Sequence, residues 1–250
     1  MTWGSFALLV AAGVAAGLSG YVAGLASLFS YPALLAAGLP PTAANVTNTV
    51  SLSVGVVSSL AGARPELVGQ APTARRLSLV CALGGATGAG LLLLTPPGVF
   101  AAVVPFLVGG AALTLLVRRA PPATARLVEQ PRRRPWLVVA IFAVSVYGGY
   151  FGAAAGVLML ALLLAALPDS LIRANALKSV LLGLANLVAA VGFALFGPVH
   201  WASTVPLILG LLVGNWIGPW VARRLPPTLL RIGIGLAGLA LAVKLGLDTF

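Results

Sequence analysis

The feature that most constrains this chain is a sequence pattern that occurs twice. Residues 44–49 read Ala-Asn-Val-Thr-Asn-Thr, and residues 174–179 read Ala-Asn-Ala-Leu-Lys-Ser. Two glycine pairs and one diproline also recur, at offsets of 126 to 132 residues: 20/24 and 152/156, 84/88 and 210/214, and 96–97 and 226–227. Similar offsets in the same chain order indicate two diverged copies of one structural unit.

The composition places this doubled unit in a membrane. Hydrophobic residues make up 60% of the chain and charged residues 8%, with a mean hydropathy of +1.08. A soluble domain carries about 25% charged residues. Several stretches are apolar over most of the ~20 residues that cross a bilayer, namely 77–94, 99–117, 136–167, 180–196 and 232–243 with its flanks. The sequence predicts an all-α polytopic membrane protein in a lipid bilayer, and a doubled unit in such a chain is typical of secondary transporters.

The basic residues are grouped between the apolar stretches. The net charge is +11, and six of the thirteen arginines lie in the Pro-rich segment 118–135. This grouping follows the rule that basic loops stay cytoplasmic. The segment lacks interleaved aromatic residues, so nucleic acid is not an expected partner. We predict a first transmembrane repeat over 1–117, a basic cytoplasmic linker over 118–135, and a second transmembrane repeat over 136–250.

When membrane crossings are counted in both directions from the cytoplasmic linker, the two copies have opposite orientations in the membrane. The turn at 96–97 then lies outside, whereas the turn at 226–227, flanked by arginines, lies inside. The 32 residues of 136–167 are too many for one span and few for two. Glycines interrupt this stretch and its counterpart in the first copy. We expect two inverted-topology repeats, each a broken or re-entrant helical hairpin plus three transmembrane helices.

Polar residues gather at membrane depth in both copies. Asn175, Ser179 and Asn186 share a helical stripe with Lys178 beside it, and Lys178 lies about 12 Å from the expected helix start, near the midplane. A lysine at this depth offers three donors and no acceptor, which suits a small oxyanion. The predicted substrate-binding residues are Asn45, Thr47, Asn48, Thr49, Asn175, Lys178, Ser179, Gly20, Gly24, Gly152 and Gly156.

Each of these residue types also has a structural interpretation. Lys178 can extend to the cytoplasmic surface along its apolar stem. Asparagines cap or cross-link helices more often than they bind ligands. Glycines permit close helix packing, and this is the main interpretation of Gly210, Gly214 and Gly218.

Few residues remain for enzymatic or metal chemistry. Cys81 is the only cysteine and His200 the only histidine, so no disulfide within the chain and no metal cluster is expected. Residues 17–20 match the short pattern around the nucleophile of rhomboid proteases, but a serine nucleophile needs a base. We predict no enzymatic activity, no metal and no cofactor. No carboxylate falls inside an expected helix, which leaves the coupling ion open.

Several stretches resemble the sulfite exporter TauE/SafE family of bacterial membrane transporters. They are the glycine-rich start of each half, the motif Ala-Asn-Ala-Leu-Lys at 174–178, and the stretch 209–218. The resemblance implies a multi-pass protein of the bacterial inner (cytoplasmic) membrane that exports a small sulfur-containing anion such as sulfite by alternating access. It implies substrate roles for Asn175 and Lys178 first, and then for Asn45 and Asn48.

Some alternatives stay open from the sequence. Residues 25–29, Leu-Ala-Ser-Leu-Phe, depart from the glycine-rich run common in that family, which leaves the substrate open. A passive anion channel would fit the same scaffold. So would a non-transport scaffold subunit whose segment 118–135 docks a partner or anionic lipid. Association into a homo-oligomer is also left open.

Overall fold

The computed structural model describes residues 2–23, 26–62, 67–117, 135–167, 171–222, 232, 236, 239–240 and 242–247. Over these residues it contains helices and no strands: α1 (Trp3–Ala23), α2 (Ser27–Ala36), α3 (Pro41–Gly62), α4 (Ala71–Leu94), α5 (Pro97–Val117), α6 (Pro135–Tyr150), α7 (Ala155–Ala166), α8 (Leu171–Phe196) and α9 (Trp201–Ala222). The all-helical prediction is confirmed for this part of the chain. Gly24, residues 118–134 of the linker and the turn at 226–227 lie outside it, as does part of the predicted span 232–243.

Three helical stretches have both the length and the hydropathy to cross a membrane: Trp3–Gly20, Ala71–Leu94 and Arg173–Phe196. In the other apolar helices, the stretches whose side chains are described are shorter, for example Pro97–Leu113 and Trp201–Ile217. Large apolar side chains point away from the protein, among them Leu79 on α4 and Trp216 on α9, which is 84% exposed. Soluble monomers rarely expose apolar surface on this scale. The outer face is therefore consistent with contact to lipid.

The long apolar stretch 136–167 is divided into two helices, as its glycines predict. α6 ends at Tyr150 and α7 begins at Ala155. Between them, Gly152 has φ of 78° and Ala154 has φ of 59°, both in the left-handed region that an α-helix cannot continue through. In the first half, α1 ends at Ala23 and α2 begins at Ser27. Each half therefore starts with two successive helices, the second shorter than the first.

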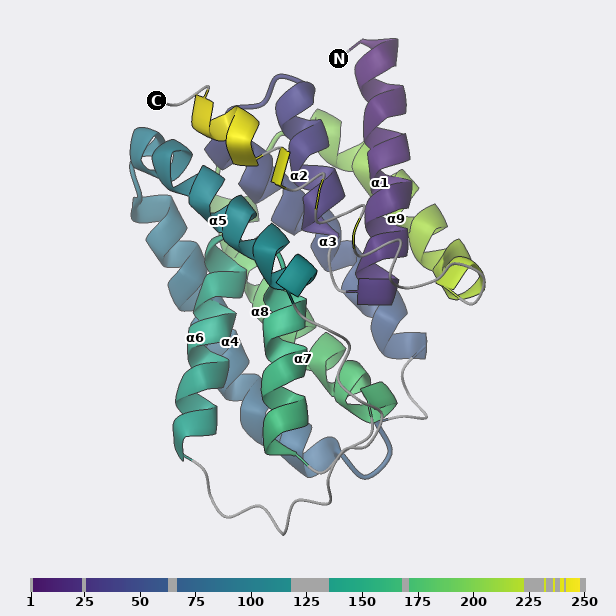
Figure 1. The fold of residues 1–250 in the computed structure, drawn as a ribbon, viewed down its shortest axis with the longest axis vertical. Coiled ribbons are helices and arrows are strands. Elements are labelled where there is room, and N and C mark those ends of the chain that lie inside the picture. The colour runs from purple at the N-terminus through teal and green to yellow at the C-terminus, as the bar shows by residue number, and fades with distance from the viewer. Residues whose placement is uncertain are drawn as a thin grey trace.

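Glycines bring two pairs of helices into backbone contact. α1 lies along α9, and α6 lies along α4 (Figure 1). A Cβ added to Gly17 would lie 2.7 Å from the backbone nitrogen of Asn215, and a Cβ on Gly210 or Gly214 would overlap a carbonyl oxygen of α1. Gly88 meets α6 in the same way. The interpretation of Gly210 and Gly214 as close-packing residues is confirmed.

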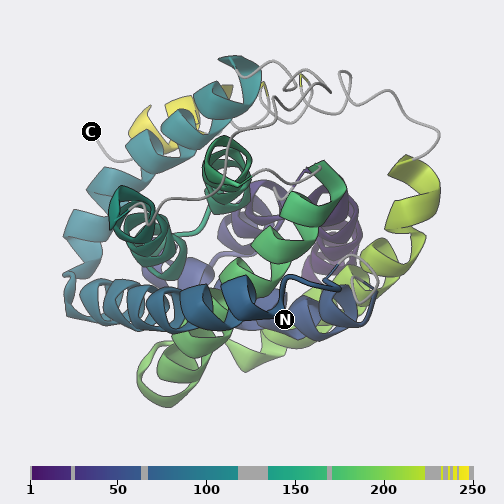
Figure 2. The ribbon, with the colours of Figure 1, turned by 90° about the horizontal axis from the view of Figure 1, so that it is seen from below.

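Both halves contribute to a common interior. One buried cluster combines Leu34 and Val46 of the first half with Phe193 and Leu207 of the second. A second cluster joins the start of α4 to α6, α7 and the first half of α8. The view from below shows the helices gathered into one bundle (Figure 2). α3 and α8, which carry the two copies of the repeated motif, pack against each other within it.

Candidate functional site

A cluster of buried polar side chains joins α2 to α3. Ser30 Oγ donates to Asn48 Oδ1 at 2.5 Å, and Asn48 Nδ2 donates to Ser27 Oγ at 3.2 Å. All three side chains are buried. Ser27 and Ser30 are three residues apart and so share one face of α2, which is the face that α3 covers. Both polar atoms of the Asn48 side chain are therefore used within the protein.

Asn45 extends this cluster to the break in the second half. It lies one turn before Asn48 on α3 and donates from Nδ2 to the carbonyl oxygen of Tyr150 at 2.8 Å. Tyr150 is the last residue of α6, where carbonyl groups lose their partners within the helix. Asn45 is 0% exposed, and its Oδ1 atom has no hydrogen-bond partner. The side chain thus holds the broken hairpin and leaves one buried acceptor unused.

Aromatic rings close the cluster on the side of the break. The rings of Tyr31 and Phe151 meet edge to face with centroids 5.4 Å apart, and Phe100 contacts both Tyr150 and Phe151. Tyr31 follows Ser27 by one helical turn and is 1% exposed. Its hydroxyl oxygen also has no hydrogen-bond partner. A buried hydroxyl usually finds one, so this group is available to a ligand or to water.

Lys178 lies inside the protein on α8. Its side chain is 6% exposed, and its Nζ donates to Asn175 Oδ1 at 2.7 Å. This burial does not fit extension to the membrane surface. The described partner is a neutral amide oxygen, which leaves the charge of the ammonium group uncompensated there. None of the hydrogen bonds described for the chain joins Lys178 to Asn45 or Asn48, although α3 and α8 are in contact.

The other predicted hydroxyls have partners in the protein. Thr49 Oγ1 donates to the carbonyl of Asn45, and Ser179 Oγ to that of Asn175, both within their own helices. Thr47 Oγ1 accepts from the backbone N–H of His200 at 2.9 Å. The first two contacts lie within one helix and the third holds the loop before α9, so each of these hydroxyls has a partner without a ligand.

The predicted glycines lie around the two breaks. Gly20 is near the end of α1, where an added Cβ would lie 3.1 Å from the Cβ of Ala26. Gly152 sits in the break between α6 and α7, and Gly156 is buried in the first turn of α7. Gly24 lies outside the described residues.

Sequence reasoning missed Ser27, Ser30 and Tyr31. A signal was present, because the spacing Ser27-x-x-Ser30-Tyr31 puts three polar groups on one face of a short apolar helix. The role of the Tyr150 carbonyl had no signal, since it depends on a contact between distant segments.

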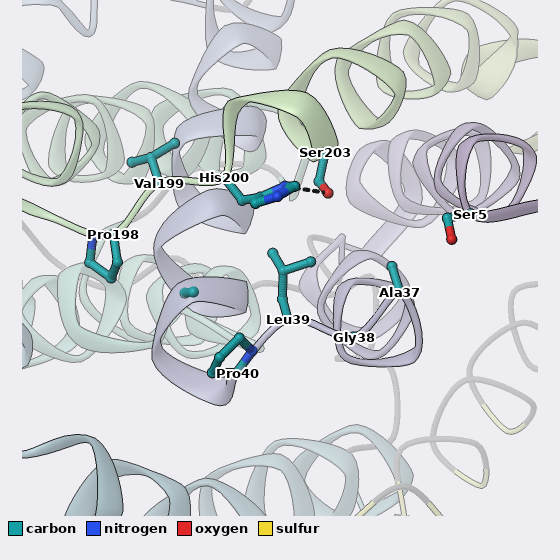
Figure 3. A pocket seen from close by; sticks show the side chains of 10 residues that line it. Ser5, Ala37, Gly38, Leu39, Pro40, Pro198, Val199, His200 and Ser203 are labelled. Carbon is teal, nitrogen blue, oxygen red and sulfur yellow. Dashed lines mark hydrogen bonds between the residues drawn. The ribbon is translucent and has the colours of Figure 1, made fainter. Parts of the chain in front are cut away.

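A separate pocket of about 500 Å³ opens at the end of the bundle where α2 meets α3 and α8 meets α9 (Figure 3). It is lined by Ser5, Ala37, Gly38, Leu39, Pro40, Ala43, Pro198, Val199, His200 and Ser203. The His200 imidazole points to Ser203, with Nδ1 and Oγ 2.9 Å apart.

Comparison with known proteins gives a consistent result. The family described as sulfite exporter TauE/SafE matches residues 9–245. The probable membrane transporter protein YfcA of Escherichia coli strain K12 is 26% identical over 94% of this chain and 87% of its own length. The probable membrane transporter proteins of Haemophilus influenzae and of Sinorhizobium (ORF9) are each 27% identical, over 97% and 98% of this chain and 94% of their own lengths. No solved structure shows a significant match.

Proposed function

Because the chain belongs to the sulfite exporter TauE/SafE family, we propose that it carries a small sulfur-containing oxyanion such as sulfite across the bacterial inner membrane. In this proposal it is a multi-pass secondary transporter that works as an exporter. The observation that carries the proposal is the buried ammonium group of Lys178, whose described partner is the neutral Asn175 amide. Burial of a charge is costly without compensation, and an anionic substrate would supply it.

The positions of the polar residues give each half its own group of candidate anion ligands. Asn175 and Lys178 occupy the places on α8 that Asn45 and Asn48 occupy on α3, and these two helices are in contact. Lysine and amide N–H groups donate hydrogen bonds, which is what oxyanion oxygens accept. Asn175 and Lys178 lie in the first two turns of α8, whereas Thr47, between Asn45 and Asn48, meets His200 beyond the end of α8. The two groups would therefore contact the anion at different points along its path.

The helix pairing supports two structurally equivalent halves. α1 of the first half packs on α9 of the second, and α6 of the second packs on α4 of the first. These are equivalent pairs if α1 corresponds to α6 and α4 to α9, as the repeated glycines indicate. We infer that the halves are inverted repeats that rock against each other. Alternating exposure of one central site is how transporters of this architecture work.

Flux measurements in proteoliposomes test the proposed function. Labelled sulfite and labelled thiosulfate are added in turn to vesicles that contain the purified protein, under anaerobic conditions that prevent oxidation of sulfite. We expect uptake of sulfite that saturates with concentration and exceeds the leak into protein-free vesicles. Absence of flux for both anions, with protein shown to be folded by circular dichroism, would contradict the proposal.

A further inference from the structure

We propose that the cluster around Asn45 binds the oxyanion in its monoprotonated form, with the O–H group of the anion donating to Asn45 Oδ1. This inference rests on the proposed function and narrows its substrate class. The cluster lies near the end of α8, where Thr47 meets His200, and is separate from Lys178 near the start of that helix. For sulfite, the species bound would be HO–SO₂⁻ and not the dianion. The site would distinguish such an anion from sulfate and thiosulfate, which carry no proton near neutral pH.

The orientation of the Asn45 amide is fixed by the broken hairpin. Nδ2 donates to the Tyr150 carbonyl at 2.8 Å, so a flipped amide would place two acceptors against each other. Oδ1 must then point elsewhere as an acceptor, and it has no partner although the residue is 0% exposed. An unsatisfied buried acceptor destabilises the protein. A ligand that donates a hydrogen bond would remove this cost, whereas one that only accepts would increase it.

The same cluster also offers donors. The Tyr31 hydroxyl is buried without a partner. Ser27 Oγ accepts from Asn48 Nδ2 and donates to none of the acceptors in the described hydrogen bonds, so its own proton is free. Two hydroxyl donors and one amide acceptor are complementary to an anion that has several acceptor oxygens and one O–H group.

Two hydrogen bonds and one ring contact bring these three groups together. Ser27 and Tyr31 lie one turn apart on α2, and Asn48 ties this face to α3 through Ser27. Asn45 lies one turn from Asn48 and bonds to the Tyr150 carbonyl. The next residue, Phe151, packs against the ring of Tyr31. The contacts thus form a closed ring through α2, α3 and the break after α6.

A pair of matched ligands tests the inference on the unchanged protein. Methanesulfinate has the charge and shape of HO–SO₂⁻ with a methyl group in place of the hydroxyl. Binding of labelled sulfite to detergent-purified protein is measured at a mildly acidic pH, with unlabelled methanesulfinate and thiosulfate as competitors. We expect methanesulfinate to bind about tenfold or more weakly than sulfite, because a hydrogen bond to a charged ligand contributes about 1.5–3 kcal/mol.

Two variants then test whether Asn45 causes the preference for sulfite over methanesulfinate. In Asn45→Leu, the affinities for sulfite and methanesulfinate should become nearly equal. In Tyr31→Phe, which removes only a donor, both anions should bind several-fold more weakly while their ratio stays the same. The ligand pair on the wild-type protein remains a complete test if Asn45→Leu does not fold.

The outcomes separate this inference from the proposed function. Equal binding of sulfite and methanesulfinate by the wild-type protein would overturn the inference and leave the anion transporter standing. A preference that survives in folded Asn45→Leu would also overturn it. Binding that requires sodium but shows no preference would assign Asn45 Oδ1 to a cation instead. Absence of binding for all three anions would overturn both proposals.

Discussion

Replacing Gly88 by valine is expected to prevent the chain from folding, whereas Gly90→Val should behave like the wild type. Both glycines lie in α4. A Cβ on Gly88 would overlap the carbonyl oxygen of Val146 and lie 2.7 Å from the backbone nitrogen of Tyr150. A Cβ on Gly90 meets nothing within 4 Å. Overpacking costs about 1–3 kcal/mol where side chains can yield, and here backbone atoms of α6 would have to move.

The measurement for this pair is the yield of monodisperse protein from detergent extracts and its melting temperature. Because both substitutions replace the same residue type in the same helix, differences in helix propensity cancel. Gly88→Val should give aggregate or a strongly lowered melting temperature. Equal melting temperatures for the two variants would show that α4 and α6 do not pack as described.

Replacing Lys178 by methionine is expected to lower sulfite flux by about 100-fold and to leave the fold intact. A hydrogen bond to a charged group contributes about 1.5–3 kcal/mol, which corresponds to roughly 10- to 150-fold. Methionine has nearly the length of lysine and no charge to bury. The substitution should therefore maintain or raise the melting temperature, because the cost of the buried ammonium group disappears. Loss of flux without loss of stability separates a substrate role from a structural one.

The chain supplies a matched control for this variant. Lys244 is the only other lysine, and it is exposed. Lys244→Met changes the net charge by the same amount and should transport like the wild type. Flux that is unchanged in Lys178→Met, or equally reduced in both variants, would contradict the role assigned to Lys178.

The sequence predicted the helical class, the family and the break in the second hairpin, whereas α1 continues through Gly17 and Gly20. These features depend on local chemistry, namely apolar composition and glycine. Gly152 predicts the break at 151–154. The spacing of small residues on one helix face predicts the close helix packing at Gly210 and Gly214. The inverted orientation of the repeats stays a prediction, since it was inferred from arginines that lie mostly outside the described residues.

The site was less accessible from sequence because its contacts join distant segments. Thr47 was predicted to bind the substrate as part of the motif, yet its hydroxyl accepts a hydrogen bond from the backbone N–H of His200 in the loop before α9. Asn45 was predicted to donate to the substrate, yet its amide nitrogen donates to the Tyr150 carbonyl, and the atom left without a partner is its acceptor Oδ1. The sequence alone does not show these two partners, His200 and Tyr150, because each contact depends on how the two halves pack against each other. The substrate roles predicted for the motif residues stay predictions.

The most direct test of the central claim is counterflow of sulfite in proteoliposomes. Vesicles are loaded with unlabelled sulfite, and a trace of labelled sulfite is added outside. A transporter that exposes one site alternately to each side exchanges bound anions, so labelled sulfite should accumulate transiently above its equilibrium level. Uptake that never exceeds equilibrium and rises linearly with concentration would identify a passive channel and contradict the account.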